Sequence, residues 1–137
     1  MSGTRPLPFE GLRVVDLTHV LAGPFGAMIL ADLGATVYKI EKPGRGDTTR
    51  GTPPFINGIS HYFLAVNRNK YSVGVDIKTP RGREVVAELA RRSDIMINNF
   101  RPGVLAQYGL DYESLKAANP GLIYCSISGF GESGPYR

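Results

Sequence analysis

The sequence has only one cysteine and lacks any long apolar run, and both features limit the class of protein to which it can belong. A disulfide needs two cysteines, so Cys125, inside the apolar stretch 122–127, is expected to be a buried thiol, and nothing argues for secretion. No segment approaches the roughly 20 apolar residues of a membrane span. Residues 1–8 lack the apolar core of a signal peptide. We therefore expect a cytoplasmic protein that does not enter a membrane.

Long runs of like charge are also missing, although the net charge is +4 and the pI about 9.4. A nucleic-acid-binding domain usually carries a basic stripe or patch. The sequence has no such stripe with interleaved aromatic residues, so nucleic acid is not an expected partner. The modest positive excess by itself suits a small polyanionic ligand as well as it suits nucleic acid.

Apolar runs alternate with helical patterns, which is typical of βαβ units around a parallel sheet. We expect strands at residues 12–17, 36–40, 72–77, 95–99 and 122–128. Helices are expected at residues 24–33, 60–67, 80–92 and 111–119, with Thr79 as a cap and Pro80 in the first turn. The Pro- and Gly-rich segment 43–58 is expected to be a long loop, a kind of segment that often carries function.

A chain of 137 residues fits one domain, here residues 1–137. Because crossovers between parallel strands are right-handed, few topologies remain. We predict an α/β fold, a Rossmann-like doubly wound parallel sheet with strand order 3-2-1-4-5. In such sheets the ligand crevice lies beside the carboxyl end of the first strand. That rule places residues 18–26, 41–50 and 98–103 on one rim.

Two motifs near this rim favour ordinary structural roles. Residues 129–134 spell GxGxxG, but the dinucleotide fingerprint requires that pattern between the first strand and a helix, so a flexible loop is expected. His19 follows the first strand, yet no histidine or carboxylate stands at metal-ligand spacing, so a structural role is expected. The first crossover, residues 17–24, still directs a helix amino terminus, which attracts anions, at the crevice.

Positive charge gathers near predicted loop ends, at Lys39, Lys42 and residues 66–70. Arginine can bind a phosphate through a bidentate fork, and lysine binds it as a point charge. Solvated surface residues would show the same pattern, and the sequence leaves both interpretations open.

Several motifs in order carry a resemblance to a known family. They are GLRVVDLTHVLAGP at 11–24, ADLGA at 31–35, KIEKPG at 39–44, NRNK at 67–70, NFRPG at 99–103 and SGFG at 128–131. Together they resemble the amino-terminal portion of the family III CoA-transferases, the group of formyl-CoA transferase and carnitine CoA-transferase. The resemblance implies that residues 1–137 form the CoA-binding part of a larger, intertwined fold.

The resemblance implies transfer of CoA from an acyl-CoA donor to a carboxylic acid. In the family an aspartate attacks the donor thioester and forms an enzyme-bound anhydride, which is nucleophilic catalysis. That aspartate is expected beyond Arg137, so no catalytic residue is assigned here, and Asp16, Asp32 and Asp47 are not given its role. Within the family, the amino-acid sequence of residues 51–55 and 64–70 favours dicarboxylic acyl-CoA donors such as succinyl-CoA.

The resemblance also implies which residues contact CoA. They are Leu21, Ala22, Lys42, Val75, Asp76, Ile77, Lys78, Asn99, Phe100 and Arg101. Lys42 stands where the family often has arginine. Lysine keeps the positive charge but lacks the bidentate hydrogen bonding of a guanidinium. Gln107 stands at another cationic position and is left out because it carries no charge. CoA is a substrate here, and no permanently bound cofactor or metal is expected.

Two alternatives stay open. The same superfamily includes α-methylacyl-CoA racemases, whose acid and base residues would also lie beyond Arg137. A non-catalytic CoA-binding module is the second alternative, since the nucleophile is missing. The family further implies a homodimer for the full-length protein, and we expect the isolated portion to be inactive and prone to associate through an unpaired strand edge.

Overall fold

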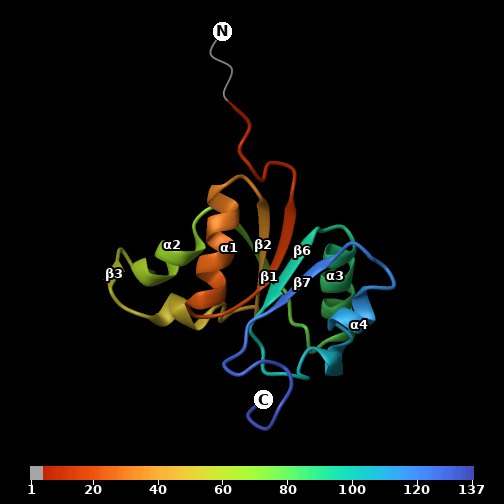
Figure 1. Ribbon diagram of the computed structural model, residues 1–137. Coiled ribbons are helices and arrows are strands. Elements are labelled where there is room, and N and C mark those ends of the chain that lie inside the picture. The colour runs from red at the N-terminus through yellow and green to blue at the C-terminus, as the bar shows by residue number, and fades with distance from the viewer. Residues whose placement is uncertain (1–4) are drawn as a thin grey trace.

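The computed structural model describes residues 5–137, so the first four residues of the segment 1–8 lie outside the described part (Figure 1). A five-stranded parallel sheet organises the chain. Its strands are β1 (Arg13–Leu17), β2 (Thr36–Glu41), β5 (Lys70–Gly74), β6 (Ile95–Asn98) and β7 (Ile123–Ser126). Their order is β5-β2-β1-β6-β7, and every pairing is parallel. The predicted α/β class and strand order 3-2-1-4-5 are confirmed.

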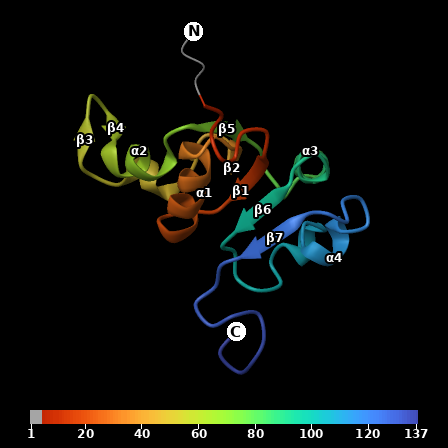
Figure 2. The same cartoon turned by 45° about the horizontal axis from the view of Figure 1, so that its top comes forward.

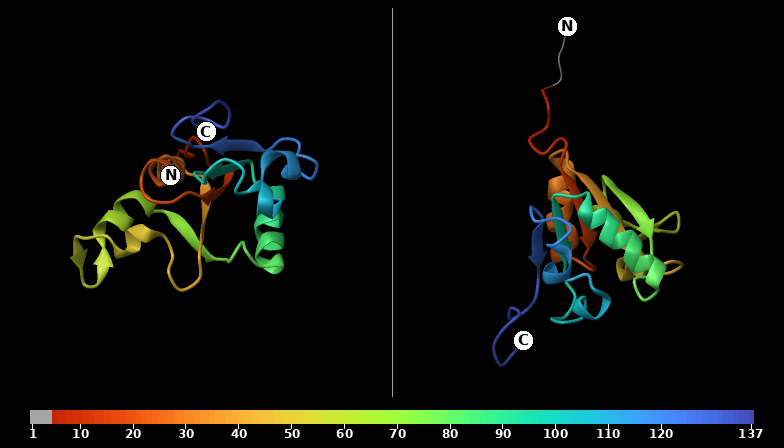
Figure 3. Two further views of the ribbon diagram at one scale, coloured as in Figure 1. Left: turned by 90° about the horizontal axis from the view of Figure 1, so that it is seen from below. Right: turned by 90° about the vertical axis from the view of Figure 1, so that its right-hand side faces the viewer.

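Helices cover both faces of the sheet, as Figures 1 and 3 show. Helices α1 (Ala22–Asp32) and α2 (His61–Asn67) lie on one side, and α3 (Pro80–Arg91) and α4 (Tyr112–Leu115) on the other. Successive residues of a strand point to opposite faces. Val14 therefore packs in a core with Ala27 of α1, while Val15 packs in a second core with Val86 of α3.

The capping side chains define where two of the helices begin. The Gly82 amide donates to Thr79 Oγ1 at 3.0 Å, and the Phe63 amide donates to Ser60 Oγ at 3.1 Å. Both bonds satisfy amide groups that a helix amino terminus leaves free. Helix α1 begins at Ala22, two residues before the predicted start, because Pro24 is compatible with any position of the first turn and does not mark the start.

The segment 43–58 is more ordered than predicted. It contains the 3-10 helix η1 (Thr48–Gly51), and β3 (Phe55–Ile56) pairs antiparallel with β4 (Ile59–Ser60). Asn57 and Gly58 form the turn of this hairpin, both with positive φ, which Asn-Gly favours in two-residue hairpin loops. Figure 2 shows the hairpin projecting away from the sheet.

Two other elements end three or four residues before their predicted boundaries. The third predicted strand, β5, begins at Lys70 and ends at Gly74, so residues 75–78 form the segment that follows it. The last helix is only α4, which ends at Leu115 and is preceded by the 3-10 helix η2 (Ala106–Tyr108). Asn119 does not extend α4. Its carbonyl accepts a hydrogen bond from the Leu122 amide, and its side chain donates to the Ser93 carbonyl at 2.8 Å.

The prediction of a buried thiol was wrong, because Cys125 is exposed. It stands opposite Ile97 in the β6–β7 register, on the face of the sheet that α1 covers. Helix α1 lies over the central strands, and β7 is an edge strand on which Ile123 is 62% exposed. None of the helices within residues 5–137 has the length and apolar character needed to cross a membrane.

Candidate functional site

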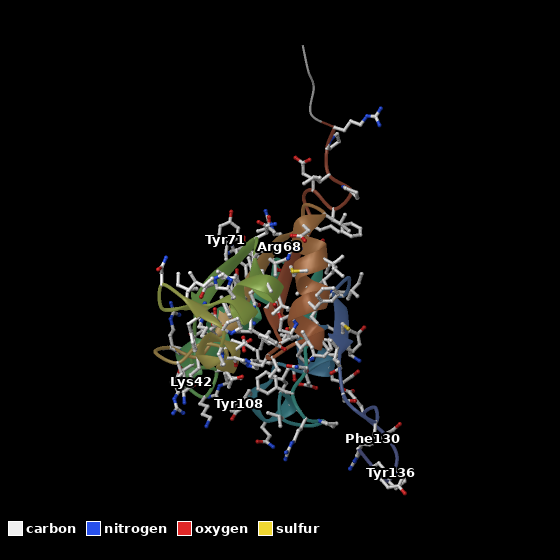
Figure 4. All side chains as sticks on the ribbon, turned by 90° about the vertical axis from the view of Figure 1, so that its left-hand side faces the viewer. Lys42, Arg68, Tyr71, Tyr108, Phe130 and Tyr136 are labelled. Carbon is white, nitrogen blue, oxygen red and sulfur yellow. The ribbon has the colours of Figure 1, made fainter. Side chains whose placement is uncertain are left out.

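A groove of about 730 Å³ opens at the carboxyl end of the central strands. Its walls come from the segments that follow β1, β2, β5 and β6, which are far apart in sequence. The lining residues are Leu17, His19, Ile40, Glu41, Lys42, Arg45, Gly46, Thr48, Gly51, Val75, Asp76, Ile77, Lys78, Phe100, Val104 and Tyr108. Figure 4 shows Lys42 and Tyr108 at the same end of the molecule. This is the edge at which a parallel sheet places its ligand site.

The interior of the groove is mostly apolar. Leu17 is the last residue of β1 and Ile40 the last but one of β2, and both are buried. Val75 and Ile77 approach from the segment after β5. Phe100 packs against the same core cluster. Apolar and aromatic lining with a few polar groups is typical of a small-molecule site.

The rim of the groove is cationic. Lys42, Arg45 and Lys78 are all exposed and line it. Their charges converge from the segments after β2 and β5, and such groups bind phosphate oxygens through charge-assisted hydrogen bonds. Asp76 also lines the groove, but one of its carboxylate oxygens accepts the Lys78 amide at 3.0 Å and so shapes the turn.

A buried ion pair lies behind the rim. Lys39 Nζ is 2.9 Å from Asp47 Oδ2 and donates to the Thr18 carbonyl at 2.9 Å. Burial alone would raise the pKa of Asp47, but the Thr49 amide and the Lys39 ammonium outweigh burial and lower that pKa below its ordinary value. Asp47 is therefore ionised at neutral pH despite being fully buried.

Glu41, at the end of β2, organises the same loop. Its carboxylate accepts two hydrogen bonds from Arg50, at 2.6 and 2.7 Å, and one each from the Asp47 amide and the Ser72 hydroxyl. Burial opposes ionisation, yet these donors lower the pKa of Glu41 to about 2. The loop from Lys42 to Arg50 is thus anchored at both ends.

The remaining predicted cations do not reach the groove. Lys70 is buried and donates to Asp16 at 2.9 Å, and burial lowers its pKa. Arg68 pairs with Asp32 across α1 and α2. Lys39 is buried as well, so of the charge cluster Lys39, Lys42, Arg68 and Lys70 only Lys42 lines the groove, and the other three have structural partners.

His19 lines the groove, and Asn99 holds its backbone. Its amide donates to the Asn99 side chain at 2.9 Å, and its carbonyl accepts from the same side chain at 2.8 Å. Burial lowers the pKa of the imidazole. Residues 5–137 contain no group of three potential metal-ligating side chains.

The structure brings six of the ten predicted contact residues into the groove: Lys42, Val75, Asp76, Ile77, Lys78 and Phe100. Asn99 and Arg101 line a second hollow of about 980 Å³, which shares Phe100 with the groove and is otherwise formed largely by residues 127–132. Leu21 and Ala22 line neither; Leu21 is the residue before α1 and is 49% exposed. Contact with CoA stays a prediction for all ten residues.

Sequence reasoning missed Arg45 and Tyr108. Arg45 lies in a Gly-rich loop directly after a predicted strand, which is a recognisable position for an anion-binding side chain. Tyr108 belongs to η2, an element that the sequence pattern does not reveal, so no local signal was available.

The GxGxxG segment lies in the second hollow rather than in the groove. Gly131 and Gly134 have positive φ, and the segment follows β7 without leading into a helix in the described residues. This is the loop that the sequence predicts. The second hollow also has Arg101 and Arg137 on its lining but lacks a wall from β1 or β2.

Comparison with known proteins identifies the family of this chain. The profile of CoA-transferase family III matches residues 9–137. Succinyl-CoA:glutarate CoA-transferase of Mus musculus is 55% identical over 129 residues, which are 93% of this chain and 30% of that protein. Succinate--glutarate CoA-transferase of Agrobacterium fabrum is 50% identical over 139 residues, 96% of this chain and 35% of that protein.

A solved structure gives the same result. The CAIB/BAIF family protein from Brucella suis superposes with a TM-score of 0.91 at 50% identity, covering 96% of this chain and 36% of that one. The chain thus spans about a third of the length of the relatives it matches. By its profile match and these relatives, the chain belongs to CoA-transferase family III.

Proposed function

We propose that this chain binds CoA and acyl-CoA in the groove, as the nucleotide-binding portion of a CoA-transferase. The single observation that supports this most strongly is the combination of an apolar interior with three cationic side chains on one rim. CoA has the matching parts, since its adenine ring and pantetheine arm are largely apolar or neutral and its phosphates are anionic. Lys42, Arg45 and Lys78 would meet the phosphates, and Phe100 the apolar part.

The reaction we propose moves CoA from an acyl-CoA donor to a carboxylic acid. The two relatives described above are named for succinyl-CoA or succinate and glutarate, which supports dicarboxylic substrates for this chain as well. Their names also favour CoA transfer over the racemase alternative. A cytoplasmic location and a homodimer of the full-length protein stay predictions.

In this proposal the nucleophile comes from outside the described residues. A carboxylate would attack the thioester carbonyl and release CoA as thiolate, leaving an acyl anhydride; the thiolate would then attack the enzyme's carbonyl, releasing the donor acid and leaving an enzyme thioester. The acceptor carboxylate would attack that thioester and again release CoA thiolate, which would attack the acceptor's acyl carbonyl and free both the enzyme carboxylate and the new acyl-CoA. The carboxylates beside the groove already have other partners. Glu41 and Asp47 are buried in ion pairs, and Asp76 accepts a turn amide. They shape the site and are poor candidates for attack.

The test is a calorimetric titration of the purified chain with CoA, adenosine 3′,5′-bisphosphate and pantetheine. We expect CoA to bind, the bisphosphate to retain most of the affinity because it carries the anionic groups, and pantetheine alone to bind weakly. NAD is the control, because it is an adenine dinucleotide without a 3′-phosphate. It should bind less tightly than CoA. No heat of binding at millimolar CoA would contradict the proposal.

A further inference from the structure

We infer that the buried Lys39–Asp47 pair is a positioning pair, which holds two walls of the groove in the arrangement that binds CoA. The inference rests on the proposed function and adds residues that do not themselves touch the ligand. Neither Lys39 nor Asp47 lines the groove, and Lys39 is 1% exposed while Asp47 is fully buried. Any effect they have on binding must therefore act through the residues they hold.

Lys39 joins the first two strands at their carboxyl ends. It belongs to β2, and its ammonium donates to the Thr18 carbonyl, directly after β1, at 2.9 Å. The same ammonium lies 2.9 Å from Asp47 in the loop that follows β2. One buried charge thus connects the β1–α1 loop, the β2 strand and the loop before η1.

Asp47 extends these connections with its other oxygen. Its Oδ1 accepts the Thr49 amide at 2.9 Å, the Thr49 hydroxyl at 2.8 Å and the Val20 amide at 3.4 Å. Val20 has φ of 72°, a conformation that is unfavourable for a β-branched residue and must be maintained by its surroundings. Asp47 is one of the groups that hold it, because it accepts the Val20 amide.

Several residues that line the groove are immediate chain neighbours of the pair or of the residue that it binds. His19 follows Thr18, whose carbonyl Lys39 binds, and Gly46 and Thr48 stand on either side of Asp47. Because a peptide unit transmits displacement to its neighbours, moving the pair moves these walls. A wall displacement of about 1 Å is sufficient to weaken a preorganised site substantially.

Stability alone does not account for the pair. Replacing a buried ion pair with apolar residues of similar volume often leaves stability unchanged or improves it, because both charges lose hydration on burial. Apolar replacements would fill the same space but could not bind the Thr18 carbonyl or the Thr49 and Val20 amides. Folding and groove geometry can therefore be separated by experiment.

The experiment compares four forms of the chain: unmodified, Lys39→Met/Asp47→Leu, Asp47→Asn and Lys70→Met. The double variant removes both charges, so the net charge is unchanged. Lys70→Met is the control for stability, since it removes a lysine whose side chain is buried in another ion pair and lines no groove. Each form is measured for Tm, for CoA affinity by calorimetry well below its Tm, and for hydrogen exchange at the Val20 and Thr49 amides.

We expect the double variant to keep a Tm near that of the unmodified chain, to bind CoA about ten-fold or more weakly, and to exchange both amides faster. Asp47→Asn should show a smaller loss of affinity in the same direction, and it serves as the second variant if the double variant fails to fold. Lys70→Met should lower Tm yet keep CoA affinity within about two-fold.

Three results would overturn the inference. One is a folded double variant, or a folded Asp47→Asn, that binds CoA as tightly as the unmodified chain. Another is an equal loss of affinity in Lys70→Met, which would indicate a general effect of stability. If the unmodified chain itself binds no CoA, the proposed function fails, and the positioning role fails with it; that outcome is recognised from the unmodified chain alone.

Discussion

The imidazole of His19 meets the ring of Phe100 edge to face, with ring centroids 5.7 Å apart. His19 follows β1 and Phe100 follows β6, so this contact joins two neighbouring strand ends at the groove. Edge-to-face aromatic pairs contribute about 0.5–1.5 kcal/mol beyond the area they bury. The contact therefore fixes Phe100 where an apolar part of a ligand would pack.

Phe100→Ala tests this part of the groove. We expect CoA affinity to fall about ten-fold, because an aromatic ring stacked on a base contributes about 1–3 kcal/mol in other systems. The free energy of unfolding should fall by about 2 kcal/mol, less than for a fully buried phenylalanine. Calorimetry with CoA and urea unfolding measure the two effects.

The matched control is Phe130→Ala. Phe130 is 76% exposed and lines the second hollow, away from Lys42 and Tyr108 as Figure 4 shows. Its replacement should change neither CoA affinity nor stability appreciably. A larger loss of affinity in Phe130→Ala than in Phe100→Ala would move the binding site to the second hollow.

Lys42→Ala tests the cationic rim. We expect CoA to bind about five-fold more weakly at low salt, and the difference to shrink at high salt because exposed charges are screened beyond about 10 Å at 0.1 M. Lys42→Arg should bind at least as tightly as the unmodified chain, since the guanidinium retains the charge and adds a fork. Titrations at two ionic strengths provide the measurement.

Lys116→Ala is the control for charge alone. Lys116 is exposed at the end of α4, where it pairs with Glu113, and it lines neither hollow. The control removes the same charge from the chain. Equal weakening in Lys116→Ala and Lys42→Ala would mean that only the net charge matters.

Glu41 makes stability depend on acid pH. Its pKa is lowered from 4.5 to about 2 in the folded chain, mainly by hydrogen bonds that outweigh burial. A carboxyl with a lowered folded pKa stabilises the fold above its unfolded pKa and loses that contribution as pH falls through the folded value. The stabilisation is at most about 3 kcal/mol, and less in practice because Arg50 is partly exposed.

Urea unfolding between pH 5 and pH 2 checks this expectation. The unmodified chain should lose stability as the pH falls. Glu41→Gln should be less stable at neutral pH, and its free energy of unfolding should change less with pH. Glu88→Gln is the control: the pKa of Glu88 is also about 2, but both partners in its pairs with Arg91 and Arg92 lie on the exposed surface, so the pairs contribute little. An unchanged pH profile in Glu41→Gln would contradict the assignment.

Gly82 links α3 to the groove through a close backbone contact. A Cβ at this position would lie 2.0 Å from the Asp76 carbonyl oxygen, so Gly82→Ala must displace the segment 75–78 that lines the groove. We expect this variant to be less stable by about 2 kcal/mol and to bind CoA more weakly. Thermal unfolding and calorimetry measure both effects.

Gly26→Ala is the matched control within a helix. A Cβ at Gly26 meets nothing within 4 Å, and alanine is the better helix former, so this change should stabilise the chain by up to about 1 kcal/mol. Its CoA affinity should stay the same. Similar behaviour of the two variants would show that the close contact at Gly82 has no influence on the groove.

The sequence predicts the fold better than it predicts the side chains at the site. Hydrophobic patterning and the handedness of crossovers are sufficient for the order of the sheet, and Thr79 and Pro80 mark the start of α3 correctly. The β3–β4 hairpin was missed although Asn57-Gly58 is a strong turn signal, because its strands have two residues each and no visible alternation.

The errors at individual side chains have a common physical origin. Lys39 resembles a surface cation in sequence, yet it is buried because Asp47, eight residues later, folds back against it. Cys125 resembles a core thiol, yet it lies on the edge strand beyond the reach of α1. Both outcomes depend on tertiary neighbours, which a local apolar or charged pattern does not specify.

The most direct test of the account is a map of CoA binding by backbone amide chemical shifts. Titration of the labelled chain should shift amides of the groove walls, such as Gly46, Lys78 and Phe100, and leave Ala35 and Ser93 at the opposite end of the sheet unchanged. Shifts confined to residues 129–137, or none at all at saturating CoA, would contradict the claim that the strand ends form one CoA groove.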